Sequence, residues 1–284
     1  MQEGIDPMTF QAVKPFLGER VSLKLSDARL TILRSGWQCT LSESQQDRSL
    51  AYSVAGQIPY YYRSPSKIAL DFQERRHALE MVLDLATKIP RTPKFQRSHF
   101  GEILCSVYLE EAFSLRRLYA KLSMTTAEDT NVHKMDAFFV NTKKKPYDYI
   151  AVEAKTSIRP MPGSKFTGHR QGIYRQLIQS LDGYGASDGR FDLVAIRDNL
   201  ERESFTSDEA KQIRQDLVPP GPPSLKILGM AVVNTNSVIP QDIDYVLTAS
   251  CKQTFEFEAL VVTDLASLAG QAYKNVKQHL GGRK

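Results

Sequence analysis

The stretch YDYIAVEAK, residues 147–155, decides which fold and chemistry we expect of this chain. A short apolar run of this kind is typical of a β-strand. Side chains two positions apart on a strand point to the same face, so Glu153 and Lys155 are expected side by side. A charged pair on an otherwise apolar strand is costly unless the charges are paired or functional. The stretch therefore predicts a strand that carries part of a functional site.

A second strand is expected just before it, in VHKMDAFFV, residues 132–140, and the loop NTKKKP joins the two. A hairpin of these strands would bring Asp136 towards Glu153. The loop places Lys143 to Lys145 at one edge of the sheet. These lysines form either a solvated turn or a set of contacts to backbone phosphates. Phosphate contacts would make binding fall steeply with salt.

Further helices and strands lie on both sides of this hairpin in the sequence. The patterns predict helices over residues 66–88, 98–113, 170–184, 208–216, 241–248 and 265–280, strands over 225–234 and 254–262, and a hairpin within 19–35. In the second helix Ser98 is the expected N-cap, and Gly101 would let the helix approach the sheet closely. We therefore predict an α/β or α+β fold, a mixed sheet flanked by helices. Residues 1–65 would form a small N-terminal part and 66–284 the main domain.

The composition is that of an ordinary globular protein, with 42% hydrophobic and 24% charged residues among 284. No stretch has the roughly 18 consecutive apolar residues of a membrane span, and the N-terminus lacks the features of a signal peptide, so we expect the cytoplasm. Three scattered cysteines argue against a disulfide framework or a structural zinc site. Residues 131–180 contain nine Lys or Arg and three acids. They form either a solvated basic face or a surface for a polyanion such as nucleic acid.

Two acid-x-Lys triplets occur in the chain, one starting at Glu153 and one at Glu209. Glu209 follows Ser207, which can cap a helix, so we interpret that triplet as a helix start. Glu153 lies on the apolar strand, where a carboxylate and a lysine together suit phosphodiester hydrolysis with a hard divalent cation such as Mg²⁺. In this interpretation Glu153 and the carbonyl of Ala154 bind the metal. Lys155 orients water or stabilises developing negative charge.

Two further carboxylates complete the predicted site. Asp136 on the neighbouring strand is the second, because its rival Asp148 lies in the opposite phase from Glu153. Glu102, in the motif Phe-Gly-Glu-Ile-Leu, is the third. It borders the apolar stripe of its helix, where it is either a site residue or a surface Glu beside the core. We therefore predict an Mg²⁺ or Mn²⁺ site built by Glu102, Asp136, Glu153 and Ala154.

A helix with Gly-Glu, a strand Asp, a Glu-x-Lys triplet and a helix with Gln come in the order of the PD-(D/E)XK nuclease superfamily, which the chain resembles. More narrowly, FGEILCSVYLEEAF, KMDAFFV, IAVEAKTS and LKILGMAVVNTNS resemble the HamA family, the nuclease subunit of the Hachiman anti-phage defence system. The resemblance implies a PD-(D/E)XK core and a bacterial defence effector that degrades DNA with a superfamily 2 helicase, HamB. It also implies metal binding by Asp136 and Glu153, catalysis by Lys155 and completion of the site by Glu102. The residues expected to contact nucleic acid are Lys143, Lys144, Lys145, Arg170, Arg175 and Gln176, with Gln179 as the alternative to Gln176.

Two other functions fit the same residues. The chain could be a free-standing restriction-type nuclease that needs no helicase, or an inactive module that binds nucleic acid or assembles with partners. Four intact charged positions argue for an enzyme, because drift would erode them first. The sequence leaves open DNA or RNA, strandedness, sequence preference, activation signal and stoichiometry.

Overall fold

The computed structural model describes residues 20–23, 36–41, 50–63, 87–124, 135–158, 172–182, 189–198, 200, 205–234, 237, 245, 255–262 and 264–280. Within these residues the strands form one seven-stranded sheet in the order β1-β2-β7-β6-β5-β4-β3. The strands are β1 Arg20–Leu23, β2 Gly36–Leu41, β3 Arg116–Ala120, β4 Ala137–Asn141, β5 Asp148–Ser157, β6 Leu225–Asn234 and β7 Glu256–Val262.

The sheet is mixed, as predicted. Its middle strands β5, β6, β7 and β2 run parallel to one another, and β1, β4 and β3 each pair antiparallel with their neighbours. The predicted hairpin of residues 132–140 with 147–155 is confirmed as β4 and β5, in register with Ala137 opposite Val152. β1 pairs with β2, whereas the expected return strand within 24–35 lies outside the described residues.

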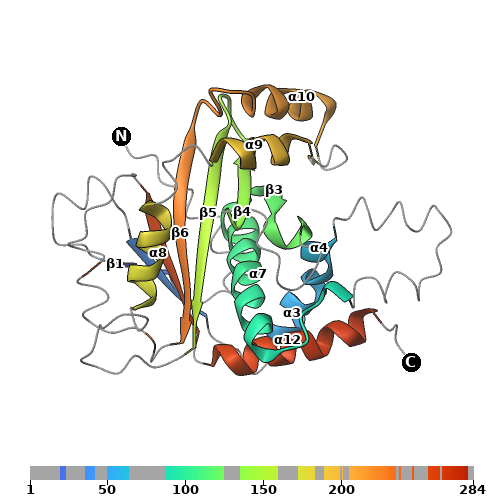
Figure 1. The fold of residues 1–284 in the computed structure, drawn as a ribbon, viewed down its shortest axis with the longest axis vertical. Coiled ribbons are helices and arrows are strands. Elements are labelled where there is room, and N and C mark those ends of the chain that lie inside the picture. The colour runs from blue at the N-terminus through green and yellow to red at the C-terminus, as the bar shows by residue number, and fades with distance from the viewer. Residues whose placement is uncertain are drawn as a thin grey trace.

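Helices cover both faces of the sheet (Figure 1). They are α3 Leu50–Gln57, α4 Pro59–Tyr62, α7 Pro93–Phe113, α8 Ile173–Asp182, α9 Gly189–Asp198, α10 Ser207–Asp216 and α12 Leu265–Leu280, with a short 3₁₀ turn, η1, at Lys121–Met124. Val152 and Ala154 of β5 belong to the core shared by α3, α4, α7 and α12. Tyr149 and Ala151, which point to the opposite face, belong to the core under α9 and α10, and α8 covers β6 and β7 beside them.

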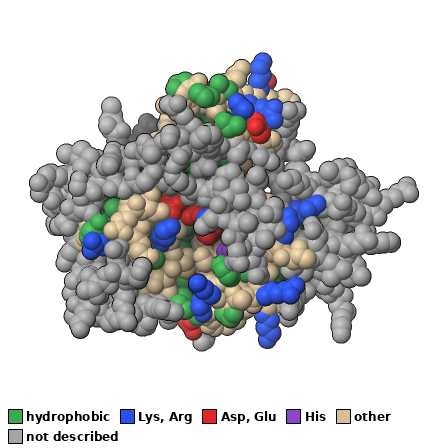
Figure 2. All heavy atoms as spheres, in the orientation of Figure 1, with side chains coloured by type: hydrophobic (Ala, Val, Ile, Leu, Met, Phe, Trp, Pro, Cys, Tyr) green, Lys and Arg blue, Asp and Glu red, His purple; other side chains and the backbone are tan. Residues whose placement is uncertain are grey.

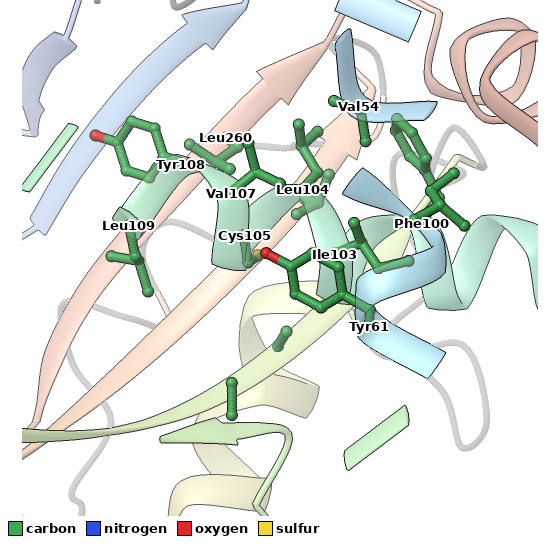
Figure 3. Close-up of a cluster of buried hydrophobic side chains, with 14 of the residues drawn as sticks. Val54, Tyr61, Phe100, Ile103, Leu104, Cys105, Val107, Tyr108, Leu109 and Leu260 are labelled. Carbon is green, nitrogen blue, oxygen red and sulfur yellow. The ribbon is translucent and has the colours of Figure 1, made fainter. Parts of the chain in front are cut away.

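α7 is the central helix of the first layer. Its buried Phe100, Ile103, Leu104 and Val107 have the spacing of one helix face, and they pack among residues of α3, α4 and β7 (Figure 3). The helix begins at Pro93 after Thr92, so the predicted N-cap at Ser98 is wrong. Proline suits the first turn of a helix because an N–H at that position would have no partner within the helix. The helix therefore begins at Pro93, earlier than the predicted start at Ser98.

Where the structure describes them, the helices and strands predicted from residue 170 onward match it, with one correction. The strands over 225–234 and 254–262 and the helix over 265–280 are confirmed as β6, β7 and α12, and the helix over 170–184 is confirmed in shorter form as α8. α10 is capped by Thr206 and not by Ser207, because the Thr206 side chain accepts from the Glu209 amide while the Glu209 carboxylate accepts from the Thr206 amide. This reciprocal pair is a capping box.

The N-terminal strands belong to the same sheet as the rest of the chain. β2 pairs with β7, and α3 packs on α12. The predicted division at residue 65 falls among residues 64–86, which the structure does not describe, and it stays a prediction. Most of the predicted helix 66–88 and nearly all of the helix 241–248 also lie outside the described residues. None of the helices in the described part is both long and apolar enough to cross a membrane.

Candidate catalytic site

The candidate site lies where β4 begins and β5 continues past it. The ladder between the two strands stops at the pair Ala137 and Val152. One residue beyond it, the Asp136 amide still donates to the Val152 carbonyl at 3.1 Å. The Asp136 carbonyl accepts from the Lys121 amide at 2.9 Å. The backbone of Asp136 is therefore fixed between β5 and the start of η1.

The carboxylate of Asp136 has a partner on each oxygen. Its Oδ2 accepts from the amide of Ala154 at 2.8 Å, and its Oδ1 accepts from Lys121 Nζ at 3.1 Å. The side chain is 6% exposed. Hydrogen bonds to a carboxylate are among the stronger ones in proteins, so Asp136 is held firmly against β5. Its partner Ala154 directly follows Glu153, so the hairpin brings Asp136 towards Glu153 as predicted.

Glu153 uses one of its two oxygens. Its Oε1 accepts from Lys155 Nζ and from Ser180 Oγ of α8, both at 2.6 Å. Its Oε2 is buried and has no hydrogen-bond partner among the described residues. The prediction that Glu153 and Lys155 share a face is confirmed by this ion pair. The Lys155 side chain is 33% exposed, whereas that of Glu153 is 4% exposed, so Lys155 is the more accessible partner of the pair.

Glu102 reaches the site from α7. The preceding Gly101 lies so close to β5 that an added Cβ would be 1.9 Å from Thr156 Oγ1. The predicted close approach of helix and sheet at Gly101 is therefore confirmed. It brings Glu102 near the carboxylates, and Glu102 Oε2 is buried with no hydrogen-bond partner in the described part of the chain.

The three carboxylates and two lysines form one electrostatic unit. Burial, followed by the charges of Asp136 and Glu153, raises the pKa of Glu102 well above its usual value, against the opposing charges of Lys121 and Lys155. Burial and the charge of Asp136 also raise the pKa of Glu153. Burial alone would lower the pKa of Lys121, but the charges of Asp136 and Glu102 raise it above its ordinary value. The carboxylates thus repel one another in a poorly solvated place.

A divalent cation would relieve this repulsion. The two unpartnered carboxylate oxygens, on Glu102 and Glu153, are hard donors of the kind that Mg²⁺ and Mn²⁺ prefer. Among the described residues no three His, Cys, Asp or Glu side chains already stand in a metal-holding group. Mg²⁺ commonly binds one or two carboxylates and keeps several waters, so the donor set fits such an ion.

Two residues of the site were not predicted. Lys121 follows β3, whose sequence Arg116–Ala120 shows no alternation of apolar and polar residues. Ser180 lies on α8 beside the buried Leu177 and Leu181. A small polar residue at the edge of an apolar helix face is common, and nothing marks this one as a partner of Glu153.

The other predicted residues lie elsewhere. Lys143, Lys144 and Lys145 form an exposed turn at the start of β5, closed by a hydrogen bond from the Lys143 amide to Asn141 Oδ1. Glu153 follows Lys145 by eight residues, so the structure does not bring this turn to the carboxylates. Asp148, at the same end of β5, accepts from Ser224 Oγ at 2.7 Å and is not part of the site.

The residues of α8 that were predicted to contact nucleic acid differ in their exposure. Gln176 and Gln179 are exposed, whereas Arg175 is half-buried with its guanidinium 4.7 Å from the ring centre of Tyr245. Arg170 lies outside the described residues. Figure 2 shows acidic side chains next to Lys or Arg in the middle of the face on which α7 lies, with further Lys and Arg around them.

The chain was compared with protein families and with curated proteins. The family model of HamA matches residues 19–280, nearly the whole chain. No curated protein matches the chain in sequence.

Proposed function

We propose that this chain, which belongs to the HamA family of the Hachiman defence system, is a metal-dependent nuclease that hydrolyses DNA phosphodiester bonds. The observation that supports this most is the electrostatic coupling of Glu102 with Asp136, Glu153 and Lys155 near the end of the β4–β5 ladder. Two carboxylate oxygens there have no partners among the described residues. Acidic groups are brought together against their mutual repulsion only where something else compensates for it.

The residues that would hold an Mg²⁺ or Mn²⁺ ion are Glu153, Asp136 and Glu102, with the carbonyl of Ala154. When bound, such an ion neutralises phosphate charge and lowers the pKa of a coordinated water. The fixed position of Asp136 lowers the cost of assembling the site, because the Ala154 amide already orients its carboxylate.

The partial exposure of Lys155 would allow its side chain to reach a bound phosphate. Its side chain is 33% exposed, and its Nζ lies 2.6 Å from Glu153 Oε1. A cation in this position can approach a phosphate oxygen and stabilise the negative charge that develops in the transition state. Ser180 donates to the same oxygen of Glu153 and so keeps that carboxylate oriented while Lys155 moves to the phosphate.

Lys121 is the second ammonium of the site. It is 17% exposed and pairs with Asp136. Asp136 also accepts a hydrogen bond from the Ala154 amide on its other oxygen, so Lys121 is not the only group that orients it. Lys121 therefore acts through its charge, which partly neutralises the carboxylates while no divalent ion is bound.

Membership of the HamA family supports a proposal for the partner and the setting. We propose that the chain works in the cytoplasm with a superfamily 2 helicase subunit of the HamB kind, which engages the DNA and controls access to the nuclease. A nuclease that acts alone, or an inactive assembly module, would behave differently in the same experiment.

The experiment compares cleavage by the chain, alone and with its helicase subunit, on linear, supercoiled and single-stranded DNA with Mg²⁺ or Mn²⁺. Glu153→Gln and Lys155→Met are expected to lower the cleavage rate by about a hundredfold or more. Glu256→Gln and Lys226→Met are matched controls, because this exposed pair of β7 and β6 lies 3.9 Å apart at the surface.

Three outcomes separate the alternatives. Loss of cleavage in the two site variants with activity kept in the controls supports the nuclease. Full activity without the helicase identifies a free-standing enzyme. Equal behaviour of wild type, Glu153→Gln and Lys155→Met in cleavage and in phage protection contradicts the enzymatic proposal.

A further inference from the structure

A second site lies on the face of the sheet covered by α9 and α10. A pocket of about 340 Å³ opens between these helices, and its lining consists of Arg197, Asp198, Lys211, Arg214, Gln215 and Val218. Three of the six residues are cations and one is an acid. Pockets of roughly 300 Å³ and more are large enough for small-molecule ligands, and the net charge of this one favours an anion.

The cations of the pocket are only partly neutralised. Arg197 Nε contacts Asp198 Oδ1 at 3.1 Å. Arg214 Nε is buried, and it has no hydrogen-bond partner among the described residues. A buried N–H of this kind normally has a partner. Because the guanidinium is planar and carries several donors in a fixed arrangement, it suits the oxygens of a phosphate group.

The pocket stands in a defined relation to the candidate catalytic site. Tyr149 Oη donates to Asp216 Oδ2 of α10 at 2.7 Å, which ties α10 to the beginning of β5. Tyr149 and Glu153 are four residues apart and point to the same face of β5, about 13 Å apart along the strand at roughly 3.3 Å per residue. The pocket and the metal-binding carboxylate therefore share one side of the sheet.

The lysine turn lies at the same end of the molecule. Thr142, next to Lys143, is hydrogen-bonded to Glu209 at the start of α10, and Arg116 pairs with that carboxylate at 2.7 Å. The exposed lysines of the turn and the cations of the pocket are thus adjacent through α10. Figure 2 shows Lys and Arg side chains gathered at this end of the molecule.

We propose that the α9–α10 pocket binds a phosphate group of a nucleotide unit, with Arg214 and Lys211 as its main ligands. Val218, which is 45% exposed, offers apolar surface for the attached sugar or base. The phosphate belongs either to the DNA backbone some nucleotides away from the cleaved bond or to a free nucleotide. The choice of ligand rests on the proposed function, since a nuclease of DNA meets both.

The test measures binding without cleavage, so that it does not depend on the nuclease activity. The full chain is titrated into fluorescein-labelled single-stranded and duplex DNA in the presence of EDTA, and the anisotropy is followed from low to moderate salt. A parallel titration uses deoxyadenosine triphosphate and inorganic phosphate, followed by calorimetry. The variants are Arg214→Gln, Lys211→Gln and the pair together, with Lys274→Gln on α12 as control because Lys274 is exposed on the other face of the sheet.

The double variant is expected to bind DNA at least tenfold more weakly than wild type and Lys274→Gln. The slope of log affinity against log salt should become shallower by about 0.9 for each lost duplex contact. Binding of the free nucleotide by wild type and its loss in the double variant would identify a nucleotide as the source of the phosphate. Arg214→Lys keeps the positive charge but removes the planar guanidinium. We expect its affinity for DNA to lie between those of wild type and Arg214→Gln.

Equal affinity and equal salt slope of wild type and double variant, for DNA and for nucleotide alike, would overturn the assignment. Thermal unfolding of each variant shows whether it is folded, since Lys211 is exposed on α10 whereas Arg214 is half-buried. If Glu153→Gln abolishes cleavage while the pocket variants bind normally, the nuclease proposal stands and the pocket proposal fails. If the pocket variants lose binding while Glu153→Gln still cleaves DNA, the pocket proposal stands and the nuclease proposal fails.

Discussion

Asp136 and Ala154 are joined by a hydrogen bond in which the Ala154 amide donates to Asp136 Oδ2 at 2.8 Å. The donor belongs to the residue that follows Glu153, so a single backbone bond couples the positions of the two carboxylates. Four observable consequences follow from this arrangement and from the close packing around it.

The first prediction concerns Asp136→Asn. Both carboxylate oxygens of Asp136 accept hydrogen bonds, one from the Ala154 amide and one from Lys121 Nζ. The NH₂ group of an asparagine would face one of these two donors, and that hydrogen bond would be lost. We expect the free energy of unfolding to fall by about 1–3 kcal/mol, together with loss of cleavage. Urea denaturation measures the first effect. Asp148→Asn, at the far end of β5, serves as control for the loss of cleavage, and unchanged stability of Asp136→Asn would contradict the described geometry.

Gly101→Ala tests the close approach of α7 to β5. Its Cβ would stand 1.9 Å from Thr156 Oγ1 and 2.9 Å from Thr156 Cβ, so helix and strand must separate. We expect a loss of about 1–3 kcal/mol in the free energy of unfolding, part of which Thr156→Ala restores. Gly270→Ala on α12 is the matched control, because nothing lies within 4 Å of its added Cβ. It should stabilise by about 0.5–1 kcal/mol, and equal effects at the two glycines would refute the close packing.

The pH dependence of stability gives a third prediction. Burial and the charges of Asp136 and Glu153 raise the pKa of Glu102 in the folded chain. A carboxyl with a raised pKa binds its proton more tightly in the folded state, so its contribution to stability is largest at low pH and is lost as pH rises above the unfolded value, about 4.3. Glu102→Gln removes this loss. In metal-free buffer the variant should become progressively more stable than wild type between pH 4 and pH 8, and a pH-independent difference in urea denaturation would exclude this origin.

Lys121→Met addresses the counter-charge at Asp136. The variant leaves the carboxylates without the 3.1 Å ammonium contact, so the metal-free chain should have a lower melting temperature. Added Mn²⁺ should raise that temperature more than it does in wild type, because the ion no longer competes with the ammonium. Thermal unfolding with and without Mn²⁺ checks both effects. Lys226→Met is the control, and an equal Mn²⁺ response in Lys121→Met and wild type would contradict the role given to Lys121.

Part of this arrangement could be predicted from local patterns. Alternation on β5 placed Glu153 and Lys155 on one face, and the hairpin loop set Asp136 beside them, because both effects depend only on residues close in sequence. The apolar spacing of α7 gave its buried face, and Gly101 indicated its contact with the sheet. These features are fixed by strand and helix geometry, so they were predictable.

The rest depends on contacts between distant residues. β3 is rich in charge, and its arginines are accommodated by rings elsewhere: Arg116 lies 4.0 Å from the ring centre of Phe205, and Arg117 lies 3.8 Å from that of Tyr61. Such partners leave no local pattern, which is why β3 and the following Lys121 were not predicted. Ser180 was missed for the same reason, since its partner Glu153 is 27 residues away.

The proposed nuclease requires that the carboxylates at the end of the β4–β5 ladder hold a divalent metal ion. The most direct measurement is the binding of Mn²⁺ by electron paramagnetic resonance to wild type, Glu153→Gln and the surface control Glu256→Gln, without DNA. We predict saturable binding to wild type and to Glu256→Gln, weakened at least tenfold in Glu153→Gln. Equal Mn²⁺ binding by all three proteins would show that Glu153 is not a metal ligand.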